Sequence, residues 1–154
     1  MDEFVDYSAN SFGCFKDMQQ KRVVITGIGM VTPLGNDVAT TWQNLLQGKS
    51  GADQISHFDA SRFKTQFACE VKNLDMSTIF DQKEMRRYDR YIHYAVKSAD
   101  EAIRNAQINI EEENALRCGV IYGSGMGGVN TLDTNIGGFF TGDGTPRYSP
   151  FFIP

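Results

Sequence analysis

The sequence has little of what marks a membrane or nucleic-acid protein. It contains no apolar run that approaches the ~20 residues of a membrane-spanning helix. Its 15 Lys and Arg residues are outnumbered by 19 Asp and Glu, for a net charge of −4. This balance argues against a general nucleic-acid binder, because neutralising phosphates requires clustered cations. We therefore expect neither a membrane nor a nucleic acid as a partner.

Cysteine and histidine are also scarce. The three cysteines, Cys14, Cys69 and Cys118, are odd in number and widely spaced, which suits neither a zinc site nor a disulfide framework. We expect reduced thiols in a cytoplasmic protein, and no metal. Cys118 is expected to be buried because it opens an apolar run. Nothing supports a nucleophilic pair with His57 or His93, and His93 is expected to be a hydrogen-bonded residue on a partly buried helix face.

The composition is that of a globular protein, with 41% hydrophobic and 12% aromatic residues. Residues 1–17 are acidic and have no apolar core behind a basic start, so we expect a disordered tail or a misassigned start rather than a signal peptide. Met18 opens a more natural beginning. Residues 18–154 are then one domain or part of one.

Hydrophobic patterns predict the elements of the first half. Residues 23–25 form a short β-branched run bounded by glycines, which predicts a buried strand. Asn36 or Asp37 can cap a helix that starts at Val38 and is stopped by Gly48, with apolar side chains at helical spacing between them. Trp42 on this helix is expected to anchor the core.

The second half begins with a mixed region over residues 49–80, read as an irregular loop with a short strand. Asp81 and Glu84 have the spacing of a capping box, and an apolar stripe follows at steps of three and four as far as Ala106. Residues 118–122 predict a second buried strand. The order strand, helix, helix, strand indicates an α/β fold with parallel pairing.

Gly27 and Gly29 follow the first predicted strand, as a phosphate-binding turn would require. The dinucleotide fingerprint needs a third glycine where this chain has Thr32, and Pro33 stands where helical hydrogen bonding should begin. A tight strand-to-helix turn is the better interpretation, and no cofactor is expected.

The glycine-rich stretch GSGMGG, residues 123–128, follows the second predicted strand. Its backbone could present N–H groups to a phosphate, or it could simply allow turning and close packing. Met126 among the glycines favours a third interpretation, in which Gly125 and Met126 line an apolar pocket.

Cations are concentrated at the start of the long predicted helix: Lys83, Arg86, Arg87 and Arg90. Cations oppose the macrodipole at a helix N-terminus, so helix stability alone would not select them there. They form either a solvated face paired with Glu84 and Asp89, or a docking surface for an acidic partner.

Four stretches together resemble the opening third of the β-ketoacyl-acyl-carrier-protein synthases, in the type II branch. They are RVVITGIGMVTPLG, KEMRRYDRYIHYAV, GVIYGSGMGGV and SPFFIP, in the family's order across residues 21–154. Each is modest alone, but four in order are specific.

The resemblance implies a thiolase-like fold, of which this chain holds an incomplete N-terminal half, and a homodimer. It implies a transferase of fatty-acid biosynthesis that condenses a malonyl unit on acyl carrier protein with an acyl thioester, releasing carbon dioxide. The family's nucleophilic cysteine and its two catalytic histidines are expected beyond Pro154, so the 154 residues alone would be inactive.

The resemblance also assigns roles to residues of this chain. Gly125 and Met126 match positions that line the acyl pocket, and Lys83, Arg86 and Arg87 match positions that dock the acidic carrier protein. SPFFIP resembles a segment near the dimer interface and pocket floor. Two alternatives stay open: a chain-length-factor-like partner subunit without the cysteine, and a nucleotide-binding module.

Overall fold

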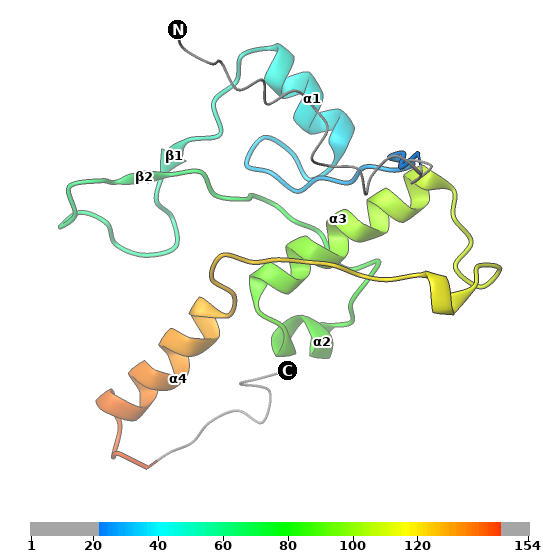
Figure 1. The fold of residues 1–154 in the computed structure, drawn as a ribbon. Helices are drawn as coiled ribbons and strands as arrows, with labels where there is room; N and C mark the ends of the chain where they lie inside the picture. The colour runs from blue at the N-terminus through cyan, green and yellow to red at the C-terminus, as the bar shows by residue number, and fades with distance from the viewer. Residues whose placement is uncertain (1–21, 146–154) are drawn as a thin grey trace, which may run out of the picture.

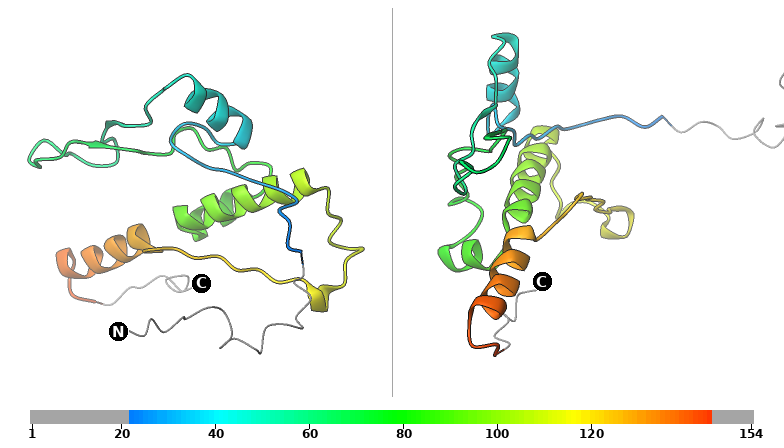
Figure 2. Two further views of the ribbon diagram at one scale, coloured as in Figure 1. Left: turned by 45° about the horizontal axis from the view of Figure 1, so that its top comes forward. Right: turned by 90° about the vertical axis from the view of Figure 1, so that its left-hand side faces the viewer.

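The computed structural model describes residues 22–145 (Figure 1). A long central helix, α3, lies between α1 and α4 in every view of the molecule (Figures 1 and 2). In chain order the elements are α1 (Val38–Leu46), β1 (Asp53–Gln54), β2 (Phe67–Ala68), α2 (Gln82–Arg87), α3 (Arg90–Ala106), a 3₁₀ turn (Ala115–Arg117) and α4 (Val129–Thr141). None of the helices formed by these residues is both long and apolar enough to cross a bilayer.

Helix α1 forms where the apolar spacing predicts it. Asp37 is its N-cap, and the carboxylate accepts hydrogen bonds from the backbone N–H of Thr40 at 2.7 Å and from its hydroxyl at 2.8 Å. Such a cap satisfies an amide that has no partner inside the helix. Trp42, expected to anchor the core, is instead 57% exposed, because no other described element covers its side of α1.

The two predicted strands do not pair with each other. The sheet formed by the described residues has two strands, β1 and β2, which are antiparallel with Asp53 opposite Ala68 and Gln54 opposite Phe67. Residues 23–25 and 118–122 have no ladder partner and carry no strand assignment. The expectation of parallel pairing was therefore wrong for this part of the chain, because a strand exists only when a neighbour supplies its hydrogen bonds.

The apolar run of residues 118–122 is correspondingly open to solvent. Val120 is 94% exposed and Ile121 is fully exposed. Cys118, expected to be buried, is exposed as well. The sequence pattern correctly marks an apolar segment, but nothing in the described region packs against it.

Residues 23–25, expected to be buried, are exposed as well, and it is the stretch that follows them, residues 27–30, that lies along α3. The backbone N–H of Met30 donates to Glu101 Oε2 at 2.9 Å, and that of Ile28 donates to Asn105 Oδ1 at 3.2 Å. Gly27 and Gly29 allow this approach: a Cβ on either would collide with a carbonyl oxygen of α3. The glycines are therefore explained by close packing against a helix.

Thr32, which stands where the dinucleotide fingerprint has its third glycine, closes the turn that follows. Thr32 and Gly35 exchange backbone hydrogen bonds of 2.8 and 3.1 Å. The Thr32 hydroxyl lies 3.0 Å from that of the buried Thr41 on α1. This confirms the predicted tight connection between an extended segment and a helix.

The long helix predicted from Asp81 is two helices. The capping box is confirmed: the Asp81 carboxylate accepts from Glu84 N at 2.7 Å, and Glu84 Oε2 accepts from Asp81 N at 3.0 Å. Helix α2 nevertheless ends at Arg87, since Tyr88 is extended at φ −102° and ψ 138°. Asp89 then serves as the N-cap of α3. The apolar periodicity continues across the break, which is why the sequence pattern misses it.

The buried apolar core of the described residues is small. Ala60 and Met76 are its fully buried members, while many larger apolar side chains are exposed, among them Leu116 at 97%. Such an extent of exposed apolar surface is typical of an interface with more protein.

The close packing of residues 27–29 against α3 can be tested by adding one methyl group to a glycine. In a full-length synthase that carries this segment, Gly29→Ala should lower the free energy of unfolding by ~1–3 kcal/mol, the usual cost of overpacking, because the new Cβ meets the Ser98 carbonyl. Gly137→Ala is the matched control: its Cβ meets nothing within 4 Å in mid-α4. It should stabilise by up to about 1 kcal/mol through helix propensity. Urea denaturation measures both, and equal effects would contradict the packing.

Candidate functional site

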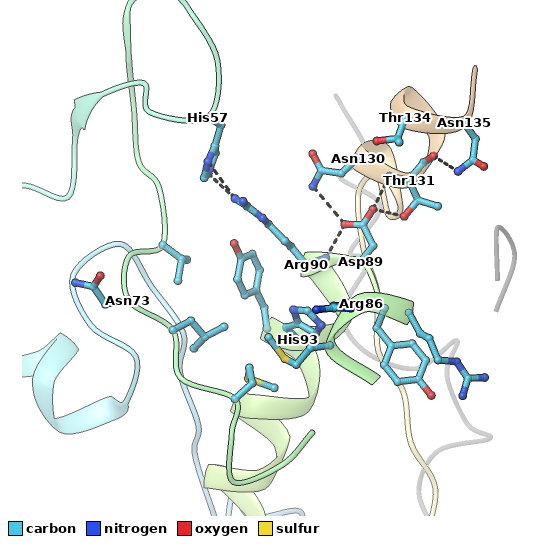
Figure 3. Close-up of a pocket in the computed structure, with 17 residues that line it drawn as sticks. His57, Asn73, Arg86, Asp89, Arg90, His93, Asn130, Thr131, Thr134 and Asn135 are labelled. Atoms are coloured by element: carbon cyan, nitrogen blue, oxygen red, sulfur yellow. Dashed lines mark hydrogen bonds between the residues drawn. The ribbon is translucent and has the colours of Figure 1, made fainter. Parts of the chain in front are cut away.

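A pocket of about 880 Å³ lies where α2, α3 and α4 meet (Figure 3). Arg86 and Arg87 contribute from the end of α2, and Arg90 and His93 from the start of α3. The first two turns of α4 contribute a polar wall: Asn130, Thr131, Thr134 and Asn135. The pocket thus combines three of the four predicted cations with α4, a helix that the sequence analysis did not predict.

Lys83, Arg86 and Arg87, the cations predicted to dock a partner, are all exposed on the six-residue helix α2. The break at Tyr88 places Arg86 and Arg87 in the last turn of this helix. Cations are favourable at a helix C-terminus, so the expected conflict with the macrodipole does not apply to these two residues. No ion pair within residues 22–145 joins Lys83 or Arg86 to Glu84 or Asp89. Glu84 is instead part of the capping box.

Arg90, the fourth cation, reaches across the pocket to a histidine far away in sequence. Its Nη1 lies 2.7 Å from Nε2 of His57 and 3.1 Å from Nδ1 (Figure 3). His57 Nε2 is in turn 3.7 Å from the Glu70 carboxylate. This contact ties the loop that contains β1 and β2 to the start of α3. The sequence offered no local signal for it, since 33 residues separate the partners.

His93 is buried, with 8% exposure, and its ring lies 5.6 Å from that of Phe80. Its Nε2 is buried and has no hydrogen-bond partner, so the prediction of a fully hydrogen-bonded histidine was wrong for this nitrogen. Burial lowers the pKa of His93 because it penalises the imidazolium, Arg90 acts in the same direction, and the Asp89 carboxylate opposes both. The ring is therefore kept neutral and acts as a packing group.

Asp89 has the largest set of hydrogen bonds in the site. Its carboxylate accepts from Arg90 N at 2.6 Å, from Thr131 N and Thr131 Oγ1 at 2.9 Å each, and from Asn130 Nδ2 at 3.4 Å (Figure 3). Burial alone would raise the pKa of Asp89, but these hydrogen bonds outweigh it and the pKa is lowered. The carboxylate therefore stays ionised and holds α3 and α4 together.

The glycine-rich stretch precedes α4. Met126 is 78% exposed, and a Cβ at Gly125 would meet nothing within 4 Å. Gly127 lies against the Tyr91 ring, whose carbons would stand 3.1–3.3 Å from an added Cβ. Neither Gly125 nor Met126 lines the pocket at the helix junction. Their place in an acyl pocket stays a prediction.

Some expectations lie outside the described residues: the tail over residues 1–17, Cys14 and the SPFFIP segment. Within residues 22–145, no three His, Cys, Asp or Glu side chains are arranged to hold a metal ion. Cys69 and Cys118 are free and exposed.

Comparison with known proteins identifies the family to which these helices and extended segments belong. The family model of the β-ketoacyl synthase N-terminal domain matches residues 20–147. The chain belongs to this family, and the suspected resemblance is confirmed.

Three curated relatives share one name among themselves. A 3-oxoacyl-[acyl-carrier-protein] synthase 2 of Coxiella burnetii is 46% identical over 137 residues, covering 89% of this chain and 33% of its own length. Those of Staphylococcus aureus strain COL and Vibrio harveyi are 45% and 40% identical, covering 88% and 89% of this chain and 33% of their own length. The chain thus spans about a third of the relatives that it matches.

Solved structures show the same fold. A β-ketoacyl synthase from Burkholderia phymatum STM815 superposes with a TM-score of 0.66 at 26% identity, covering 87% of this chain and 32% of its own. The ishigamide ketosynthase/chain length factor gives 0.68 at 24% identity, covering 84% and 32%. The predicted thiolase-like, partial α/β fold is confirmed.

The buried imidazole predicts a pH dependence of stability. Because folding lowers the pKa of His93, the unfolded chain binds the proton more readily. Stability is therefore complete above the unfolded pKa of about 6.5 and is lost as pH falls through the folded value. In a full-length synthase carrying this segment, His93→Phe should remove this component between about pH 7 and pH 5.

Urea denaturation at several pH values measures the effect. Phe80→Leu is the control, because it disturbs the same ring contact without changing a titratable group. Its destabilisation should be independent of pH. If His93→Phe also shifts stability equally at every pH, the buried ring does not titrate as argued.

Proposed function

We propose that this chain is the N-terminal third of a β-ketoacyl-acyl-carrier-protein synthase of fatty-acid biosynthesis. The reaction is the condensation of a malonyl group, carried on acyl carrier protein, with an acyl chain, with loss of carbon dioxide. The observation that carries the proposal is the identity of 40–46% to relatives named 3-oxoacyl-[acyl-carrier-protein] synthase 2 over 88–89% of this chain. We expect the nucleophilic cysteine and the histidine pair of the family beyond Pro154.

The cationic helix supports a role in docking the carrier protein. Lys83, Arg86 and Arg87 are exposed on α2, beside an open pocket that contains a further arginine, Arg90. The chain as a whole is acidic, with a net charge of −4, so a local cluster of cations stands out against its surroundings. Such a surface steers an acidic partner and fixes its orientation.

The glycine-rich stretch supports a role at the acyl chain. Met126 is a flexible apolar side chain on an exposed loop, with space beside Gly125. In the complete fold, an apolar side chain this exposed is expected to pack against something, either a fatty chain or the surrounding protein. We assign Gly125 and Met126 to the wall of the acyl pocket.

Two alternatives are less well supported. A nucleotide-binding turn at Gly27 and Gly29 conflicts with the structure, because the space beside these glycines is taken by the backbone of α3. A chain-length-factor-like subunit would share the fold, but the curated relatives cited above are named as synthases. The complete enzyme is proposed to be a cytoplasmic homodimer that needs no cofactor.

Charge reversal tests the docking surface. In a full-length synthase carrying this segment, Arg86→Glu combined with Arg87→Glu should weaken affinity for the acyl carrier protein about tenfold or more at low salt, and less at high salt, because mobile ions screen the attraction. The matched control reverses Lys49 and Arg104, which are exposed on other parts of the molecule. Calorimetry or surface plasmon resonance measures the dissociation constants. Equal losses for the two double variants would reject a local docking site.

A size change tests the pocket wall. Met126→Ala should allow acyl chains longer than the normal limit, and Met126→Trp should shorten it, because the side chain limits the space for the chain end. One methylene in an apolar pocket is worth about 10- to 200-fold in specificity, so the change should be visible in kcat/KM across a series of acyl thioesters. Leu116→Ala, a change at another exposed apolar residue, is the control. An unchanged chain-length profile in both Met126 variants would remove this residue from the pocket.

A further inference from the structure

Helix α4 begins without a cap of its own. Its N-cap residue is Gly128, in the left-handed region at φ 72°, and no side chain of the segment caps the helix. The third residue after Gly128, Thr131, donates its backbone N–H to the Asp89 carboxylate at 2.9 Å. In an ordinary helix this amide is bonded by the N-cap side chain. A carboxylate 42 residues earlier in the sequence therefore supplies the cap.

The same carboxylate caps a second helix. Asp89 is the N-cap of α3 and accepts from Arg90 N at 2.6 Å. Its Oδ2 takes both Thr131 bonds, and its Oδ1 takes the bonds from Arg90 N and from Asn130 Nδ2. One charged group thus completes the N-termini of α3 and α4, where a negative charge is favoured by both macrodipoles.

A second contact joins the same two segments. Gly127, which follows Met126, lies on the face of the Tyr91 ring near the start of α3. The carboxylate and the ring therefore hold both sides of Gly128, the residue from which α4 starts. Since Met126 is bonded to Gly127, its position relative to α3 depends on these two contacts.

We infer that Asp89 is a positioning residue that sets the acyl-chain limit. By capping α4 from the start of α3, it fixes the loop that carries Met126. The inference rests on the proposed function of Met126 as a pocket wall. Arg86 and Arg87 lie on α2, which has its own capping box, and the Asp89 carboxylate bonds α3 and α4 rather than α2. A change in the carboxylate should therefore loosen chain-length selection without weakening the carrier-protein contact.

The test uses Asp89→Ala and Thr131→Val in a full-length synthase carrying this segment. Both variants should reduce discrimination between the longest acyl chain normally used and chains two or four carbons longer by about threefold to tenfold, the net contribution of a typical hydrogen bond. KM for the carrier protein at a fixed, short chain should stay within about twofold. Because the two residues bond each other, the double variant should show less than the product of the single effects.

Two controls match the chemistry of the two substitutions. Asp100→Ala removes a carboxylate from the same helix α3, where it pairs with Arg104. Thr141→Val removes a hydroxyl from the other end of α4, where it bonds the Gly137 carbonyl. Both should leave the chain-length profile unchanged. Asp89→Asn keeps one acceptor oxygen but not the charge, and should restore part of the discrimination lost in Asp89→Ala.

The outcomes separate the inference from the function on which it rests. If Met126 variants alter the profile but Asp89→Ala and Thr131→Val change only overall activity or melting temperature, Asp89 is merely structural and the inference is overturned. If Met126 variants also leave the profile unchanged, the pocket assignment itself fails. A loss of carrier affinity in Asp89→Ala as large as that in the arginine double variant would likewise contradict a role confined to positioning.

Discussion

The junction of α2, α3 and α4 depends on one ionised carboxylate. Asp89 ends the extended break after α2, begins α3 and completes α4, and its hydrogen bonds keep its pKa low despite burial. Without this group, two helix N-termini would keep unsatisfied amides, and the glycine-rich loop would lose its main polar attachment. The helices contribute little apolar burial of their own, since few of their residues are fully buried. Polar contacts of this kind therefore carry much of the arrangement.

Local signals in the sequence predicted α1 and the start of α2, but not the break at Tyr88 or helix α4. Asp37 and the capping box at Asp81 and Glu84 appear where the spacing places them, and α1 ends shortly before Gly48, as expected. The family resemblance is confirmed over residues 20–147. The fold class was also correct, as the superposition on ketosynthases shows. These features succeed because each depends on residues three or four positions apart, or on several short motifs in a fixed order.

Features that depend on distant partners were missed. Residues 118–122 have a strand pattern but no neighbouring strand, so Val120 and Cys118 are exposed. Tyr88 interrupts the predicted helix, and Asp89 just after it bonds Thr131, a contact across 42 residues. The bond between Arg90 and His57, and the missing partner of His93 Nε2, likewise follow from tertiary placement. Hydrophobic periodicity indicates which side chains are apolar and favour burial, but it does not indicate which part of the protein packs against them.

The bare apolar segment at residues 118–122 has a consequence for biosynthesis. A ribosome that makes one of the relatives has about two thirds of the chain still to produce when this part emerges. At a rate of synthesis of about 5–20 residues per second, the unpaired backbone and apolar side chains of this segment stay accessible for many seconds. Unpaired extended backbone of this kind is a template for wrong strand addition. Nascent chains with this segment therefore expose an aggregation-prone stretch until another part of the protein covers it.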